Sequence, residues 1–429
     1  MKILLVNPPN CGRSIPEEMY GITSIKQIFR GEPLALEVLA GNLDGHEVAI
    51  LDLKVHPGNL AATLAGFRPD LVGITAVTCE ANTACLIATA AKESTGAVVV
   101  VGGIHASGDP DFFNRPGIDF VVVGIGKASF RELADALERG AGAGSIPGVA
   151  PTCPGRPLRF VPRAFGRGDL VEDKAPRYDL VAANRAHYAL LNHPMGFVAS
   201  AFGCPYDCHF CCITNQAGGR YLACGIDAVI RDIGLLPEVP FIRMVDANTF
   251  GQPSHARQLV RAIRDAGIKK DFFADVRADT VVRHPDLLQE WKDAGLRTVI
   301  IGFEDITDEG LSGMNKASGV AQNREAIRIL RAMGVTIVGD FIVSPQYAPA
   351  DFHQLMTFID KNPIDLPIFT VMTPLPGTSL YRTMHERIVN HNLDYYTLSN
   401  AVLPTRLPEG EFYRRYADLF HLTHPKARI

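Results

Sequence analysis

Short β-branched segments alternate with helical stretches twice along this 429-residue chain, and no other feature constrains its fold as strongly. Each segment is followed by enough chain for a crossover helix, so the pattern predicts parallel sheets covered by helices. A stretch punctuated by glycine and proline, which suits neither a long helix nor a central strand, separates the two alternating parts. The sequence therefore predicts an α/β protein with domains at 1–140 and 196–385, a linker at 141–195 and a small C-terminal helical cap at 386–429.

The first alternating part predicts a doubly wound, Rossmann-like sheet with a ligand crevice where its strands end. Strands are expected at 2–6, 47–51, 71–75, 97–101 and 120–123. Ligands of such sheets bind beyond the carboxyl ends of the strands. The residues there, which we assign to a candidate cofactor site, are Asn7, Thr75, Gly102, Gly103, His105 and Gly124. Tight turn geometry is the commoner explanation of such a glycine pair taken alone, so the ordered set of loops carries this prediction.

The second alternating part predicts a partial (β/α)6 barrel. Its strands are expected at 197–201, 241–245, 272–276, 298–302, 336–342 and 368–372. Barrel enzymes place their sites at the carboxyl ends of the strands, so a site is expected at that mouth. In the tail, apolar residues recur at helical spacing over 409–422, which predicts a helix that caps the barrel.

Three cysteines follow the first predicted barrel strand. Cys204, Cys208 and Cys211 stand in a C-x3-C-x2-C run, and no fourth cysteine continues the spacing. Three thiolates on a cluster of four irons leave one iron open, whereas four thiolates would restrict the cluster to electron transfer. The run therefore predicts a metal centre that can bind a ligand.

A structural zinc site is the main alternative for these cysteines. Zinc closes with four ligands, which usually come from two short hooks far apart in sequence. The candidates for a fourth ligand are His209, Cys212 and Cys224. His209 lies inside the loop and Cys212 adjoins a ligand, so neither reaches the same metal easily. A disulfide framework is disfavoured because nothing in the chain indicates an oxidising compartment.

The cysteine run, with Phe210 directly before the third cysteine, resembles the cluster motif of radical S-adenosylmethionine (SAM) enzymes. The resemblance implies a [4Fe-4S] cluster whose open iron binds SAM, and a one-electron cleavage that yields methionine and a 5′-deoxyadenosyl radical. It also implies contacts to SAM: Asp246 and the next two residues at the methionine amino group, Arg277 at the carboxylate, Glu304 at the ribose hydroxyls and Phe210 at the adenine. Alternatively, Arg277 and Glu304 pair with each other or face solvent, and Phe210 keeps water from the cluster.

The first domain resembles the cobalamin-binding domain that precedes the barrel in one subfamily, which includes the class B radical SAM methylases. The resemblance lies in three segments, at 7–9, 45–48 and 102–105, and it implies bound cobalamin. Related domains that ligate cobalt carry Asp-x-His-x-x-Gly, whereas this chain has Asp52 followed by His56, two places late. His56 is therefore not assigned as a cobalt ligand, the lower axial position has no assigned ligand, and a vestigial first domain stays possible.

Composition and charge exclude some partners. The net charge of -4 argues against nonspecific binding to nucleic acid. The longest apolar stretches fall far short of the roughly 20 residues that span a bilayer. The N-terminus lacks the length and the cleavage site of a signal peptide. We therefore expect a cytoplasmic protein with no nucleic-acid partner and no membrane span.

The leading function that these resemblances imply is a cobalamin-dependent radical SAM enzyme, a C-methyltransferase acting on an unactivated carbon of a small-molecule or natural-product substrate. Such an enzyme needs an external electron donor such as flavodoxin or ferredoxin. A second hypothesis directs the same radical to cyclisation, rearrangement or group transfer, with or without cobalamin. A third is a noncatalytic iron-sulfur or zinc-binding sensor module.

Overall fold

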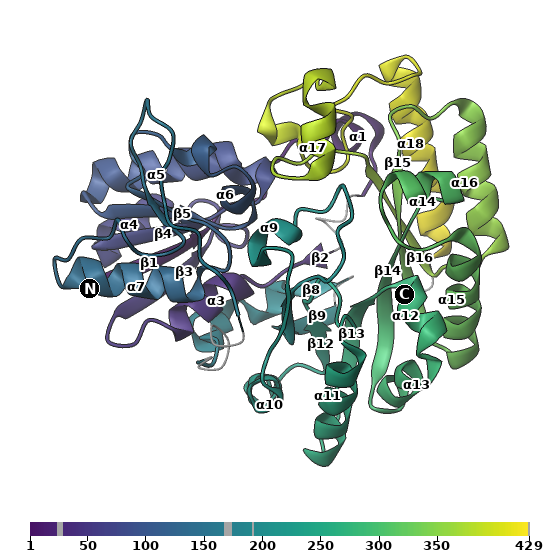
Figure 1. Ribbon diagram of the computed structural model, residues 1–429, viewed down its shortest axis with the longest axis horizontal. Helices are drawn as coiled ribbons and strands as arrows, with labels where there is room; N and C mark the ends of the chain where they lie inside the picture. The colour runs from purple at the N-terminus through teal and green to yellow at the C-terminus, as the bar shows by residue number, and fades with distance from the viewer. Residues whose placement is uncertain (24–28, 167–173, 191–192, 428–429) are drawn as a thin grey trace.

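Two sheets side by side account for the two alternating parts of the sequence in the computed structural model, which describes residues 1–23, 29–166, 174–190 and 193–427 (Figure 1). The first sheet contains, in spatial order, β3 (Glu47–Asp52), β1 (Lys2–Asn7), β4 (Leu71–Thr75), β5 (Val98–Gly102), β6 (Phe120–Val122) and β7 (Val149–Pro151). All neighbours are parallel except β6 and β7. The five strands predicted for this part are confirmed to within one residue at each end.

Helices cover both faces of the first sheet because its strands are apolar on both faces. The helices are α3 (Leu34–Gly41), α4 (Leu60–Phe67), α5 (Ala81–Thr95), α6 (Ile104–Gly108) and α7 (Gly126–Glu138). Along β1, Ile3 and Leu5 share a core with residues of α3 and α7, whereas Leu4 and Val6 share another with α4 and α5. This alternation confirms the doubly wound, Rossmann-like fold.

The second sheet is a curved half-barrel. Its strands are, in spatial order, β16 (Leu366–Val371), β15 (Thr336–Val343), β14 (Leu296–Glu304), β13 (Asp271–Val276), β12 (Phe241–Met244), β9 (His193–Val198), β8 (Ala189–Leu190) and β2 (Phe29–Arg30). The helices between them are α10 (Ile226–Gly234), α11 (Pro253–Asp265), α12 (Ala278–Arg283), α13 (Pro285–Asp293), α14 (Asp308–Gly313), α15 (Val320–Met333) and α16 (Pro349–Lys361). Six neighbouring strands, β9 and β12 to β16, run parallel, so the partial (β/α)6 barrel is confirmed.

Two features of the second sheet differ from the prediction. The first barrel strand ends at Val198, and Ala201–Gly203 forms β10, which pairs with β11 (Tyr221–Ala223) in a separate hairpin. The strand breaks because the backbone amides of Ser200 and Ala201 donate to the buried Asp246 carboxylate, at 2.7 and 2.8 Å. The short strands β2 and β8 were also not predicted, and through them the sheet continues antiparallel beyond β9.

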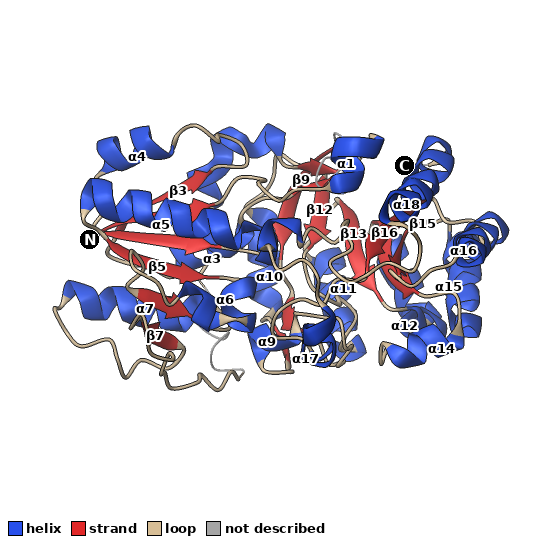
Figure 2. Cartoon of the chain, turned by 90° about the horizontal axis from the view of Figure 1, so that it is seen from above, coloured by secondary structure: helices blue, strands red, loops and turns tan. Residues whose placement is uncertain are grey.

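The predicted C-terminal cap, residues 386–429, contains the helix α18 (Glu409–Thr423), and α17 (Ser379–Met384) directly precedes the cap. The helix α1 (Ile15–Tyr20) lies beside α18 (Figure 1). Figure 2 shows α15, α16 and α18 on the side of the half-barrel turned away from the first domain. The apolar stripe predicted for residues 409–422 is buried in α18. The Tyr416 hydroxyl of this helix donates to the Phe369 carbonyl of β16, at 2.7 Å. The predicted capping helix is thus confirmed. Within the described ranges, no helix is long and apolar enough to cross a membrane.

Candidate active site

A cavity of about 750 Å³ lies between the strand ends of the first sheet and the start of the half-barrel. Five of the residues predicted for the cofactor site line it: Asn7, Thr75, Gly102, Gly103 and Gly124. Its opposite wall includes Phe202, Gly203 and Ala247, so the cavity also reaches the neighbours of Cys204 and Asp246 in the chain. One space therefore touches both parts of the predicted site.

The wall of the first domain is fixed by a buried carboxylate. Asp52 at the end of β3 accepts hydrogen bonds from the Asn7 amide, at 2.9 Å, and from the Tyr188 hydroxyl, at 3.0 Å. Tyr188 comes from the predicted linker and lines the cavity. Gly103 has a φ of 99°, and a Cβ there would lie 2.7 Å from the Thr75 hydroxyl, so only glycine lets these two loops approach.

His105 is buried away from the cavity, unlike the other predicted residues of the first domain. It is not among the residues that line the cavity, and it packs edge-on against Phe112 and Phe113, with ring centroids 5.1 and 5.5 Å away. Burial, followed by the nearby Arg115 charge, lowers the pKa of His105 to about 4. His56, which was not assigned as a ligand, is exposed and contacts the Asn184 side chain at 2.9 Å.

The three cysteines of the predicted metal site lie on one loop between β10 and α9 (Thr214–Ala217). Within the described ranges, no three cysteine, histidine, aspartate or glutamate side chains are placed to hold a single metal ion. Burial raises the pKa of the Cys204 and Cys211 thiols, to about 12 for Cys211. Phe210 is half-buried in the same loop.

A second loop braces the cysteine loop. The backbone amide of His209 donates to the Met314 carbonyl at 3.0 Å, and the Asn315 side chain donates to the Asp207 carbonyl at 2.6 Å. Asn315 and Ala317 both have positive φ, a conformation that costs energy for residues other than glycine. We call residues 313–317 the brace.

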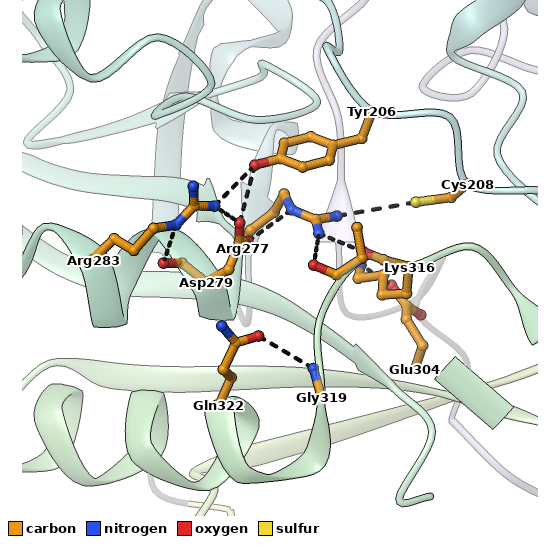
Figure 3. A network of polar contacts seen from close by, with 10 residues as sticks. Tyr206, Cys208, Arg277, Asp279, Arg283, Glu304, Lys316, Gly319 and Gln322 are labelled. Atoms are coloured by element: carbon orange, nitrogen blue, oxygen red, sulfur yellow. Dashed lines mark hydrogen bonds and ion pairs between the residues drawn. The ribbon is translucent and has the colours of Figure 1, made fainter. Parts of the chain in front are cut away.

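Arg277 is held between these two loops by contacts that are drawn in Figure 3. Its Nε donates to Asp279 at 2.9 Å, and its Nη2 donates to the Lys316 carbonyl of the brace. The Tyr206 ring of the cysteine loop lies over the guanidinium, with its centroid 3.6 Å from Cζ. Nη1 points at the Cys208 sulfur, 4.0 Å away. The expected partner of Arg277, the SAM carboxylate, therefore competes with groups of the protein itself.

Glu304 forms an ion pair at the end of β14. Its Oε1 accepts a hydrogen bond from Lys316 Nζ at 2.7 Å, and both side chains are buried. Glu304 has a φ of 62° and is the last residue of β14, directly after an irregularity in the β14–β15 register. Sequence reasoning missed Lys316, because nothing in its local pattern marks a lysine whose partner lies 12 residues away.

The remaining predicted residue, Asp246, is engaged by the protein itself. Its carboxylate accepts from the Ser200 hydroxyl at 2.7 Å as well as from the two backbone amides that end β9. Its side chain therefore fixes the start of the cysteine loop, while the next residue, Ala247, faces the cavity.

The interior of the half-barrel also holds Asp340, which the sequence did not single out. Burial raises the pKa of Asp340 well above its usual value, and the nearby Glu304 and Asp275 carboxylates raise it further. Asp275 is paired with Arg243, and Glu304 with Lys316. These groups comprise two cations and three carboxyls, and the two ion pairs leave Asp340 as the third carboxyl.

The residues present fit an iron-sulfur cluster and a large planar cofactor. Three thiols on one loop form a donor set that suits an iron-sulfur cluster, and Arg277 points at one of them, Cys208. Bound metal deprotonates a coordinating thiol, which removes the cost that burial imposes on the thiolates of Cys204 and Cys211. At about 750 Å³ the cavity is in the upper part of the range for cofactor sites, and bare backbone at Gly102 and Gly126 lines it.

Comparisons with known proteins agree with this geometry. The B12 binding domain model matches residues 25–134, and the radical SAM superfamily model matches residues 198–359. A hopanoid C-3 methylase from Methylococcus capsulatus is 28% identical over 90% of this chain and 75% of its own length. An anaerobic magnesium-protoporphyrin IX monomethyl ester cyclase from Synechocystis is 24% identical over 100% of this chain and 87% of its own.

Solved structures show the same fold over nearly the whole chain. The radical SAM methyltransferase TsrM from Kitasatospora setae, with cobalamin and a [4Fe-4S] cluster bound, has a TM-score of 0.70, 22% identity, and 90% and 74% of the two chains covered. The cobalamin-dependent radical SAM enzyme OxsB, with aqua-cobalamin and SAM bound, has a TM-score of 0.72 at 15% identity, covering 98% of this chain and 66% of its own. With its B12-binding domain, its radical SAM domain and a cavity of about 750 Å³ between them, the chain belongs to the radical SAM superfamily, in the group whose members carry an N-terminal cobalamin-binding domain.

Proposed function

We propose that this protein is a cobalamin-dependent radical SAM C-methyltransferase that methylates an unactivated carbon of a small molecule. The observation that carries the proposal is the shared cavity, whose walls include Gly102 and Gly124 of the first domain and Gly203 beside the cysteine loop. A substrate there would lie between both cofactors. Similarity to a hopanoid C-3 methylase supports methyl transfer as the reaction.

In this proposal, Cys204, Cys208 and Cys211 hold the cluster, and Glu304 accepts hydrogen bonds from the SAM ribose hydroxyls. When bound, the cluster supplies the electron that cleaves SAM, and cobalamin supplies the methyl carrier. An external donor such as flavodoxin or ferredoxin provides the electron. The chain itself orients these groups, and a substrate that fills the cavity would displace water, which limits quenching of a reactive radical.

The same proposal assigns residues 1–140 to cobalamin, 141–195 to a linker, 196–385 to the radical SAM barrel and 386–429 to a cap. The strand β2 supports a division that is not strictly sequential. Residues 29–30 come from the first of these ranges but extend the sheet of the barrel.

The products separate methyl transfer from other radical chemistry. The reconstituted protein is incubated anaerobically with SAM, cobalamin, a low-potential reductant and candidate small molecules, beginning with a hopanoid. We expect S-adenosylhomocysteine and 5′-deoxyadenosine together, with a product that carries an added methyl group. Cys204→Ala, Cys208→Ala and Cys211→Ala are each expected to abolish both products, whereas Cys212→Ala, the matched control, keeps its cluster. Loss of the cluster in Cys212→Ala would contradict the ligand assignment.

A second candidate is a radical SAM cyclase, because the magnesium-protoporphyrin cyclase is similar over the full length of this chain. It predicts 5′-deoxyadenosine and methionine with a true substrate, and no S-adenosylhomocysteine. That outcome would exclude methylation and favour cyclisation or rearrangement.

A further inference from the structure

Arg277 is placed to act on the iron-sulfur cluster. We infer that Arg277 positions the cysteine loop and raises the reduction potential of the cluster that Cys208 would bind. The inference rests on the proposed function, because it requires the cluster. It assigns Arg277 a role different from binding the SAM carboxylate.

Most of the hydrogen-bonding capacity of Arg277 is already used. A guanidinium has five N–H donors in one plane. In Arg277, Nε donates to the buried Asp279, and Nη2 faces the carbonyls of Lys316 and Ala317. A carboxylate ligand would need two parallel donors of the fork. In Arg277, Nη2 faces a brace carbonyl and Nη1 faces the Cys208 sulfur. A SAM carboxylate would therefore have to displace one of these two acceptors.

The guanidinium of Arg277 is held in place by the Tyr206 ring and by Asp279. Only 7% of Arg277 is exposed, and the Tyr206 ring covers one face of its guanidinium. The Tyr206 hydroxyl donates to Asp279 at 3.0 Å, so the cysteine loop is tied to the partner of Arg277 as well as to Arg277 itself. A side chain held this way keeps Nη1 directed at the Cys208 sulfur.

The local charge favours the reduced cluster. Arg277 and Arg283 contribute two positive charges around the single negative charge of Asp279, which leaves one excess positive charge near Cys208. Reduction adds one electron from the external donor, hence one negative charge, with no bond or proton transferred. A buried positive charge stabilises added negative charge more strongly than a solvated one. Hydrogen bonds to cluster sulfurs and nearby charge also tune cluster potentials.

The test is a redox titration of the cluster, followed by electron paramagnetic resonance, in the full-length reconstituted protein without SAM. Arg277→Gln is expected to make reduction at least tenfold less favourable, a shift of about 59 mV to lower potential for one electron. Arg277→Lys keeps the charge and is expected to recover part of the shift. Arg283→Gln is the matched control: it also removes one positive charge, but its side chain is 57% exposed, so its shift is expected to be smaller.

A second variant, with the opposite change in charge, tests the inference if Arg277→Gln does not bind its cluster. Asp279→Asn removes the negative charge that offsets Arg277 and is expected to raise the potential. An unchanged potential in Arg277→Gln at full iron content would overturn the inference. If that variant binds no iron, an unchanged or lowered potential in Asp279→Asn would overturn it instead. Failure of the wild type to bind iron would refute the proposed function itself.

The affinity for SAM distinguishes the inferred role of Arg277 from the role expected from sequence, which was to bind the SAM carboxylate. Binding is measured for the wild type, Arg277→Gln and Arg277→Lys by the change in the cluster spectrum on adding SAM. We expect closely similar affinities for all three. A large loss of affinity in Arg277→Gln with an unchanged potential would restore the SAM carboxylate as the partner of Arg277 and overturn the inference.

Discussion

At the scale of single residues, burial decides which ionisable groups of this protein are charged. His105 is 2% exposed and packs against two aromatic rings, and both of its ring nitrogens lack hydrogen-bond partners among the described residues. Its pKa is lowered to about 4, so it is neutral in the folded protein at ordinary pH. Its place in the Gly102–His105 segment suggested a cofactor contact, whereas its surroundings indicate a packing role.

His105 should make the folded protein less stable at acidic pH. An unfolded histidine has a pKa of about 6.5, so between pH 6.5 and 4 the unfolded chain binds a proton that the folded chain does not. This residue therefore contributes stability that is present above pH 6.5 and is lost as the pH falls, by about 1.4 kcal/mol per unit. Urea unfolding at pH 7.5 and 5.5, followed by circular dichroism, should show a smaller pH effect in His105→Leu.

The same variant also tests the assignment of the cavity. His105→Leu is expected to keep the cobalamin content of the wild type, because the side chain lies outside the cavity lining. Equal pH dependence in both proteins, or loss of cobalamin from the variant, would contradict this interpretation of His105.

At the scale of elements, the brace connects the cysteine loop to the end of β14. It contacts the cysteine loop through Met314 and Asn315, and β14 through the Lys316–Glu304 pair. Its two positive-φ residues and the positive φ of Glu304 store strain that these contacts offset. The pair is buried, so removing one partner would leave the other charge without compensation.

Lys316→Met should therefore destabilise the barrel by about 3–5 kcal/mol, the usual cost of breaking a buried ion pair. Trp291, which is fully buried in the barrel and is the single tryptophan of the chain, reports this unfolding by fluorescence in urea. The double variant Lys316→Met with Glu304→Gln should recover most of the loss, since no unpaired charge remains. Equal instability of the single and double variants would mean that lysine packing, and not charge pairing, matters here.

The elements show why some of the fold was predictable from sequence. Strands such as β4, predicted to the residue, have buried apolar patterns and clear turn residues at their ends. The strands β2 and β8 have two residues each, too short for any periodic signal. The break after β9 arises from Asp246, 46 residues away from Ser200, and a contact that distant leaves no local pattern.

Some residues of the candidate site could likewise be predicted from the sequence, and others could not. The cysteines and the loops at the strand ends could be predicted, because spacing and order along the chain define them. The partners of Arg277 could not, since Asp279, Tyr206 and Lys316 meet it only after the barrel has closed. Lys316 and Asp340 were missed because the role of an ionisable group inside the barrel depends on its surroundings, which the sequence does not display.

At the scale of the whole molecule, several ties between the domains fix the walls of the cavity. β2 pairs with β8, and Arg185 forms an ion pair with Glu32 in the same region. The Phe197 amide of the barrel also donates to Glu32, at 3.2 Å. A further tie joins the cap to the N-terminal segment, where the Asn400 side chain donates to the Arg13 carbonyl at 2.8 Å. Glu32 and both residues of β2 also line the cavity, so these ties adjoin the space between the domains.

The central claim is that this cavity holds cobalamin next to the cluster, and the most direct test is the iron and cobalamin content per chain after anaerobic purification from cells supplied with cobalamin. We predict roughly four irons per chain, together with stoichiometric cobalamin that remains bound through gel filtration. Four irons with no cobalamin would contradict the claim, and would leave a radical SAM enzyme whose first domain has lost its cofactor.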